Sequence, residues 1–265
     1  MSIKSTILGS KSIRYVVQVV KRYYNRLYLM NIRHKQPVLV YQMAKVGSMS
    51  VFEALSKRGV KPIYHLHNLV SGSRIVWRDQ VVFEDIIKKG KDVKIIVLIR
   101  EPIARNLSRF WYSNNKNING WSDRVDLETF TREFVEATDQ NFPLNWFDIE
   151  LKAATGVDIY SYTFPSCGYM IVDEGPYSIL VLKTELDDSI KEEVIGLFVG
   201  LPNFQIDKRV NVSKSEKYRA FKKKIELPYR YVSNMYTSKY AQHFGYSDEI
   251  RYKWLEPIFR KELNQ

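Results

Sequence analysis

The segment from Gln42 to Ser50 contains the residue types that hold a phosphate-like anion. It follows the apolar run 37–41 and precedes residues 51–56, whose apolar side chains have helical spacing. This order predicts a strand, a short turn and a helix N-terminus, where free N–H groups and the helix dipole attract anions. A glycine allows close backbone approach, serines add hydroxyl donors, and a lysine adds a cation. The candidate anion ligands are Lys45, Val46, Gly47, Ser48, Met49 and Ser50.

The spacing in this turn differs from that of a nucleoside triphosphate-binding P-loop. That loop places its lysine directly after its second glycine, whereas Lys45 precedes Gly47. Ordinary ATP or GTP chemistry is therefore disfavoured. An alternative interpretation is that Gly47 and the serines serve only turn geometry and helix capping.

A second candidate anion site follows the β-branched run 93–99, which predicts a buried central strand. Pro102 suits the first turn of a helix over 102–113. Arg100 then stands at the carboxyl end of the strand, where open α/β sheets bind ligands. Ser108 follows about two helical turns later, so both side chains could reach one phosphate.

These two segments resemble the sulfotransferases that use 3′-phosphoadenosine 5′-phosphosulfate (PAPS). Lys45 to Ser48 is similar to the family's Lys-x-Gly-Ser loop for the 5′-phosphosulfate, and Arg100 with Ser108 is similar to its Arg-x7-Ser pattern for the 3′-phosphate. Ser213 and Lys214 resemble the basic loop that closes over the nucleotide. The resemblance spans roughly residues 37–250. It implies a PAPS donor and a P-loop NTPase-like sulfotransferase fold.

The pair His65 and His67 lies between the two candidate anion sites. Alternation over 61–68 predicts a short strand with both rings on one face. Histidine can take the proton of an acceptor hydroxyl near neutral pH, and resemblance to some carbohydrate sulfotransferases favours His67 as the base, with His65 as its support or substitute. A structural role within the strand end stays open, and Glu53 is a further candidate base.

A closer resemblance involves bacterial capsular polysaccharide synthesis proteins, which carry an Asn-Lys-Trp-Tyr-Ser motif. The similar residues are 111–113, 144–148 and 156–160, although Arg109 and Phe110 precede Trp111 here. This resemblance implies a carbohydrate acceptor. Aromatic side chains such as Trp146 and Phe147 either stack on its sugar rings or fill the core.

Length and composition predict one domain over 37–265, preceded by a basic helical segment over 1–36. The chain has 265 residues, 45% of them hydrophobic, and its single cysteine, Cys167, rules out an intrachain disulfide. Strands that alternate with helices predict a three-layer α/β/α fold with a central parallel sheet.

The net charge of +12 predicts anionic partners. The PAPS nucleotide is one such anionic partner. The basic residues form no nucleic-acid motif, so we expect no nucleic-acid partner. Residues 1–36 lack an apolar stretch long enough to span a bilayer and lack a signal-peptide cleavage site. They either pack on the domain or bind a membrane surface, and we expect a cytoplasmic protein.

Together with these resemblances, the candidate residues imply transfer of a sulfuryl group from PAPS to a hydroxyl of a carbohydrate or polysaccharide. Lys45 and the turn amides would stabilise the leaving phosphate, and we expect no metal requirement. Two alternatives stay open. One is a phosphoryl transferase on the same scaffold, and the other is a non-catalytic protein of capsule assembly that binds a nucleotide or a glycan.

Overall fold

A five-stranded sheet organises the protein in the computed structural model, which describes residues 16–17, 19–20, 23–24, 35–70, 77–114, 127–137, 139–207 and 216–246. The strands are β1 (Val38–Tyr41), β2 (Ile63–Leu66), β3 (Val93–Ile99), β4 (Tyr169–Glu174) and β5 (Tyr177–Lys183). Their order across the sheet is β2-β1-β3-β5-β4.

Four neighbouring strands are parallel, and one edge strand is not. β1 pairs in parallel with β2 and β3, and β3 pairs in parallel with β5. β4 runs antiparallel to β5, with Glu174 opposite Tyr177 across a tight hairpin at Gly175. The predicted α/β class is confirmed and the sheet is mostly parallel, but the antiparallel edge strand β4 was not expected. β4 was missed because an edge strand with one exposed face lacks the continuous apolar run that marks a central strand.

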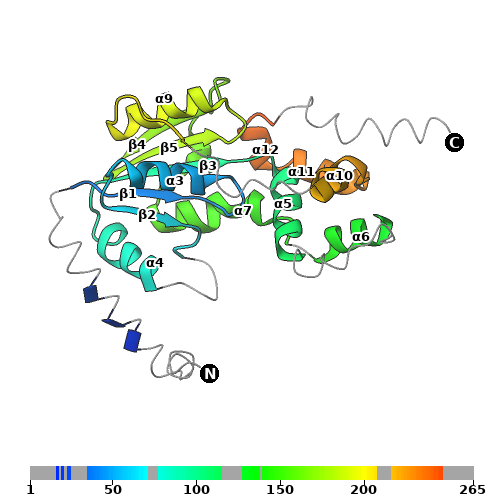
Figure 1. Cartoon of the computed structure of the whole chain (residues 1–265), viewed down its shortest axis with the longest axis horizontal. Helices are drawn as coiled ribbons and strands as arrows, with labels where there is room; N and C mark the ends of the chain where they lie inside the picture. Colours follow the sequence, from blue (N-terminus) through cyan, green and yellow to red (C-terminus); the bar gives the residue numbers. More distant parts are fainter. Residues whose placement is uncertain are drawn as a thin grey trace.

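Helices surround the sheet, and Figure 1 shows α5, α10, α11 and α12 grouped beyond the carboxyl ends of the strands, while α9 lies beside β4 and β5. Helical periodicity in the sequence predicts helices over 48–58, 102–113, 126–138 and 187–199, and the structure confirms each of them within one residue at each end. The helix bounds are α3 (Ser48–Lys57), α4 (Trp77–Val82), η1 (Phe83–Ile87), α5 (Pro102–Asn114), α6 (Leu127–Ala137), α7 (Phe142–Trp146), η3 (Phe147–Lys152), α8 (Ala153–Thr155), η4 (Ile159–Ser161), α9 (Asp188–Val199), α10 (Glu216–Lys224), α11 (Tyr229–Tyr236) and α12 (Lys239–His243).

Residues 142–155 form an interrupted helix rather than the single regular helix that periodicity predicts for 144–155. The turn η3 between α7 and α8 is a π-helix, and the helix ends at Gly156, which has a left-handed φ of 83°. A π-turn shifts the side chains that follow it around the helix axis. Here it lies among residues whose side chains, Phe147, Glu150 and Leu151, are all buried.

The core consists of the central strands and an aromatic layer. Trp146 and Phe147 are 0% and 1% exposed, and the Trp146 ring packs edge-on against Tyr41 at 5.1 Å. The core alternative for these two aromatics is therefore correct, and they cannot stack on a sugar. In the described part of the chain, no helix is long and apolar enough to cross a membrane.

Candidate anion-binding site

The turn between β1 and α3 has an unusual backbone. Lys45 and Gly47 both have positive φ values, 76° and 79°. Gly47 suits this conformation because it has no Cβ, whereas a lysine adopts it only where its surroundings hold it there. Such strained positions occur preferentially at functional sites.

Three side chains hold this turn by its carbonyl groups. Arg105 Nε donates to the Ala44 carbonyl at 3.1 Å, and Arg100 Nη1 donates to the Lys45 carbonyl at 2.8 Å. The Thr184 hydroxyl donates to the Val46 carbonyl at 2.7 Å. Three successive carbonyls are thus bound by residues at or after the ends of β3 and β5.

The orientation of the carbonyls sets the orientation of the amides. In a trans peptide the C=O and N–H groups point in opposite directions. The N–H groups of Lys45, Val46 and Gly47 therefore point away from the side chains that bind the turn. Together with the first amides of α3, they form a row of donors of the kind that binds anions.

Nothing in the first turn of α3 competes with an anion for these amides. Gly47 is the N-cap, no side chain caps the helix, and the first turn carries no acidic residue. Ser48 and Ser50 are buried, Met49 is half-buried and Gly47 is exposed. The turn is thus accessible at Gly47 and closely packed behind it.

Four cations surround the turn. The pKa of Lys45 is lowered from its ordinary value, first by burial and then by the charges of Arg100, Arg109 and Arg105. Arg105 is only 3% exposed, and burial lowers its pKa to about 10. In the described residues, no ion pair joins any of the four to a carboxylate. Arg109 is exposed, whereas the other three cations are at least partly buried, and mutually repelling cations of this kind are stabilised when an anion binds.

The histidine pair lies directly against the turn. Ser48 Oγ is 2.8 Å from His65 Nε2, and the two histidine rings pack edge-on at 4.8 Å. His67 Nδ1 lies 2.9 Å from the Gln42 carbonyl. A carbonyl only accepts, so Nδ1 carries a proton and neutral His67 has its lone pair on Nε2. Glu53, the other candidate base, is half-buried on α3.

Arg100 and Ser108 are brought together by tyrosines from the C-terminal helices. Tyr240 on α12 accepts from the Arg100 N–H at 3.2 Å and donates to the Arg100 carbonyl at 2.8 Å. Tyr218 on α10 lies close enough to both Ser108 and Arg100 for each of them to lower its pKa. Burial raises the pKa of Tyr218, and the nearby positive charge of Arg100 opposes that rise. The structure thus places Arg100 and Ser108 around one tyrosine.

The start of α5 is fixed by Glu101. Its carboxylate accepts from the N–H groups of Ile103 and Ala104 at 2.8 and 2.7 Å and from the Tyr236 hydroxyl at 2.9 Å. Burial raises the pKa of this carboxyl. A side-chain cap of this kind fixes where the helix begins, and so it fixes the spacing from Arg100 to Ser108. The last two predicted nucleotide ligands, Ser213 and Lys214, lie outside the described residues.

Glu150 in η3 is a supporting residue that sequence reasoning missed. It is fully buried and accepts from the Tyr41 hydroxyl at 2.6 Å and from the N–H groups of Leu69 and Val70 at 2.7 and 3.2 Å. Trp146 Nε1 also donates to the His67 carbonyl at 3.1 Å. The buried end of α7 and η3 therefore holds the chain that leaves β2 and carries His67.

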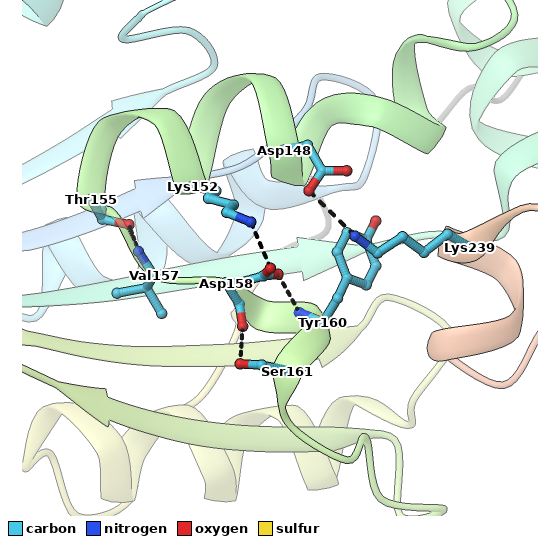
Figure 2. Close-up of polar contacts among 8 residues, drawn as sticks. All are labelled: Asp148, Lys152, Thr155, Val157, Asp158, Tyr160, Ser161 and Lys239. Atoms are coloured by element: carbon cyan, nitrogen blue, oxygen red, sulfur yellow. Dashed lines mark hydrogen bonds and ion pairs between the residues drawn. The ribbon is translucent and has the colours of Figure 1, made fainter.

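A network of charged side chains anchors α12, the helix that carries Tyr240. Figure 2 shows Lys239 reaching Asp148, with its Nζ 3.5 Å from the carboxylate and 3.8 Å from the centre of the Tyr160 ring. Asp158 accepts from Lys152 Nζ at 2.7 Å and from the Tyr160 N–H at 3.0 Å. Every charged residue in Figure 2 has an oppositely charged partner.

Residues 115–247 match the model of a protein family described as "NKWYS: Putative capsular polysaccharide synthesis protein". The chain belongs to this family. The match includes the predicted segments 144–148 and 156–160, whereas residues 111–113 precede it. It covers Glu150 and Tyr240, but the turn at Lys45 to Ser50, the histidine pair and Arg100 all lie before it. Comparison with curated proteins and with solved structures gave no significant match.

Proposed function

We propose that this member of the family transfers a sulfuryl group from PAPS to a hydroxyl group of a carbohydrate. The turn at Lys45 to Ser50 and the cations around it carry this proposal. Turn amides that point away from the side chains bound to their carbonyls, and four cations without a carboxylate partner in the described residues, suit a ligand with several negative charges. The resemblance of Lys45 to Ser48 and of Arg100 with Ser108 to the sulfotransferase motifs favours PAPS. The sulfotransferase form of the P-loop-like fold is part of the same proposal.

The chemistry assigns one task to each group of residues. PAPS supplies an activated sulfuryl group, and attack by the acceptor oxygen forms a new S–O bond while the bond to the phosphate oxygen breaks. Lys45 and the turn amides stabilise the negative charge that the phosphate oxygen gains. His67 Nε2 takes the proton of the acceptor hydroxyl. Arg100 and Ser108 bind the 3′-phosphate and fix the position of the donor.

The family description supports the carbohydrate acceptor. A protein of capsular polysaccharide synthesis acts where sugar hydroxyl groups are abundant. The histidine pair supports the same assignment, because a hydroxyl acceptor needs a base and both rings lie against the anion-binding turn. The acceptor class thus rests on the family, and the donor class rests on the turn.

Calorimetric titration with adenosine 3′,5′-bisphosphate, the product nucleotide, tests the donor site. Wild type should bind, and Lys45→Gln and Arg100→Gln should each weaken binding at least about tenfold, because each removes a charge-assisted contact. Lys152→Gln is the matched control, since this lysine is paired with Asp158 away from the turn. Preference for ATP over the bisphosphate would replace the proposal with phosphoryl transfer.

Turnover separates an enzyme from a non-catalytic binding protein. The assay follows release of adenosine 3′,5′-bisphosphate from PAPS in the presence of purified bacterial capsular glycans. Glycan-dependent release that is lost in Lys45→Ala supports catalysis. Tight nucleotide binding without release on any glycan would identify a binding protein of capsule assembly.

A further inference from the structure

The described residues of the N-terminal segment carry a stripe of exposed apolar side chains. All six of them, between positions 16 and 24, are helical. The five exposed ones follow the spacing i, i+3, i+4, i+7 and i+8, which lines one side of a helix. They are Val16, Val19, Val20, Tyr23 and Tyr24, and their exposed fractions lie between 48% and 70%.

This stripe differs from the other exposed apolar residues. In the rest of the described chain, large exposed apolar side chains are spread over several elements, with at most two on any one of them, as Ile171 on β4 and Ile190 and Leu197 on α9 show. Scattered apolar residues are normal on a protein surface, whereas a contiguous patch marks a contact. The stripe therefore needs a partner that accepts valine and tyrosine side chains along a helix.

The charge of the same segment indicates what that partner is. Eight of the 41 Lys and Arg residues lie in residues 1–36, and none of the 29 Asp and Glu residues do, so this segment supplies +8 of the net charge of +12. The first acidic residue of the chain is Glu53. Arg14 precedes the stripe, and Lys21 and Arg22 stand between Val20 and Tyr23. A partner of this segment must therefore offer an apolar surface to the stripe and negative charges to the basic residues beside it.

We propose that the stripe at residues 16–24 binds the surface of an anionic lipid bilayer. Valines enter the boundary of the acyl chains, tyrosines lie at headgroup level, and the lysines and arginines pair with lipid phosphates. A second copy of this chain is a poorer partner, because two segments of charge +8 repel each other. Nucleic acid would satisfy the charge and leave the valines exposed to water.

Membrane attachment would place the proposed reaction at the bilayer surface. The attachment itself does not depend on whether the protein catalyses that reaction. A protein bound in this way would act on glycans at the bilayer surface rather than on glycans in solution. The binding experiment described next uses no nucleotide and no acceptor. Its outcome is therefore independent of whether the sulfotransferase proposal holds.

The test is co-sedimentation of the full-length chain with vesicles. Vesicles of phosphatidylcholine with added phosphatidylglycerol should bind the wild type, and binding should weaken as salt rises. Vesicles of phosphatidylcholine alone should bind much less. Val20→Asp should lower partitioning about tenfold or more, since it places a charge in the apolar stripe. Double charge reversal, Lys21→Glu with Arg22→Glu, should lower it on the anionic vesicles.

Leu197→Asp is the matched control, because Leu197 is 77% exposed on α9 and lies outside the stripe. It should bind as the wild type does, and thermal unfolding should show that all variants fold equally. Absence of wild-type binding to anionic vesicles would overturn the proposal, as would equal loss in Val20→Asp and Leu197→Asp. Light scattering without lipid provides a further check. A wild-type dimer that Val20→Asp dissociates, together with no vesicle binding, would assign the stripe to self-association.

Discussion

Each half of this protein holds a cluster of charged residues, and the two clusters are built in opposite ways. Around the turn at Lys45, four cations lie close together, and in the described residues none of them has a carboxylate in an ion pair. In the family-matched half, Lys152 pairs with Asp158 and Lys239 pairs with Asp148. Charges paired with each other contribute modest stability and bind nothing else. Like charges held together without oppositely charged partners cost stability, and a ligand of opposite charge offsets that cost.

The residues proposed to bind and react with the substrates and the residues that hold them in place come from different parts of the chain. The turn, the histidine pair and Arg100 come from residues before 115, whereas the groups that hold them from behind, Glu150 and Tyr240, come from the matched region. The family model, which matches residues 115–247, therefore covers Glu150 and Tyr240 but not the turn. We expect substitutions in the first half to change catalysis and substitutions in the second half to change stability.

The largest expected effect is on the proposed base. His67→Gln should lower turnover by about 10²–10⁴-fold, the usual contribution of a general base, with little change in affinity for adenosine 3′,5′-bisphosphate. His243→Gln is the control from the matched half and should keep turnover within a few-fold. If His65→Gln loses turnover and His67→Gln does not, the roles of the two histidines are exchanged. If neither loses it, Glu53 is the next residue to replace.

Removal of Glu150 should give the largest loss of stability. Glu150→Ala leaves the Tyr41 hydroxyl and the N–H groups of Leu69 and Val70 without their acceptor. Two of these donors, the Tyr41 hydroxyl and the Leu69 N–H, are buried, and each buried donor without a partner costs about 1–3 kcal/mol, so we expect a loss of about 2–6 kcal/mol in the free energy of unfolding, measured in urea. The control, Asp148→Ala, removes a carboxylate whose side chain is 41% exposed and should cost under about 1 kcal/mol. Equal losses in the two variants would contradict the supporting role of Glu150.

The local elements of the first half were predictable from the sequence because their signals are local. A β-branched run followed by Arg-Glu-Pro fixes β3 and the start of α5, and both boundaries are confirmed within one residue. The residues that share the turn were also predictable, since carboxyl ends of parallel strands meet at one edge of a sheet. What spacing could not reveal is that Arg100 and Arg105 bind the carbonyls of the turn. Each of these two contacts joins residues that are more than 50 positions apart in the sequence.

The supporting half was less predictable because its contacts are long-range. Glu150 lies 109 positions from Tyr41, and an acidic residue within a helical pattern normally faces water. The π-turn η3 accompanies its burial, and no regular helical periodicity indicates such a turn. One signal was available in the sequence. Phe147 lies three residues before Glu150 and Leu151 lies one residue after it, so Glu150 falls close to the apolar side of the helix. That pattern could have identified it as a buried acid.

The lowered pKa of Lys45 predicts how anion binding depends on pH. Burial and three arginine charges disfavour the protonated amine in the free protein. A bound anion favours the protonated form, so the pKa rises on binding and affinity is highest where Lys45 is charged. Affinity for the bisphosphate should therefore fall as pH rises through the lowered pKa, by at most about tenfold per pH unit.

Lys45→Gln removes the titrating amine and should make the affinity nearly independent of pH over that range. Lys152→Gln, from the matched half, should keep the wild-type profile. Calorimetry at a series of alkaline pH values measures all three curves. A profile for Lys45→Gln that falls as steeply as that of the wild type would assign the titration to another group.

The smallest expected effect comes from the charged network of Figure 2. Lys239→Ala removes the contact with Asp148 and the position of Nζ over the Tyr160 ring. The lysine side chain is 56% exposed, so the loss of unfolding free energy should be about 1 kcal/mol or less. Nucleotide affinity should stay within about twofold, because the Tyr240 hydroxyl still contacts the backbone of Arg100. Tyr240→Phe removes both of those hydrogen bonds and should weaken nucleotide binding more than Lys239→Ala does, although it removes no charge. If Lys239→Ala weakened nucleotide binding as much as Tyr240→Phe did, the charged network of Figure 2 would itself position Arg100. In that case α12 would contribute to nucleotide binding through its surface charges and not only through Tyr240.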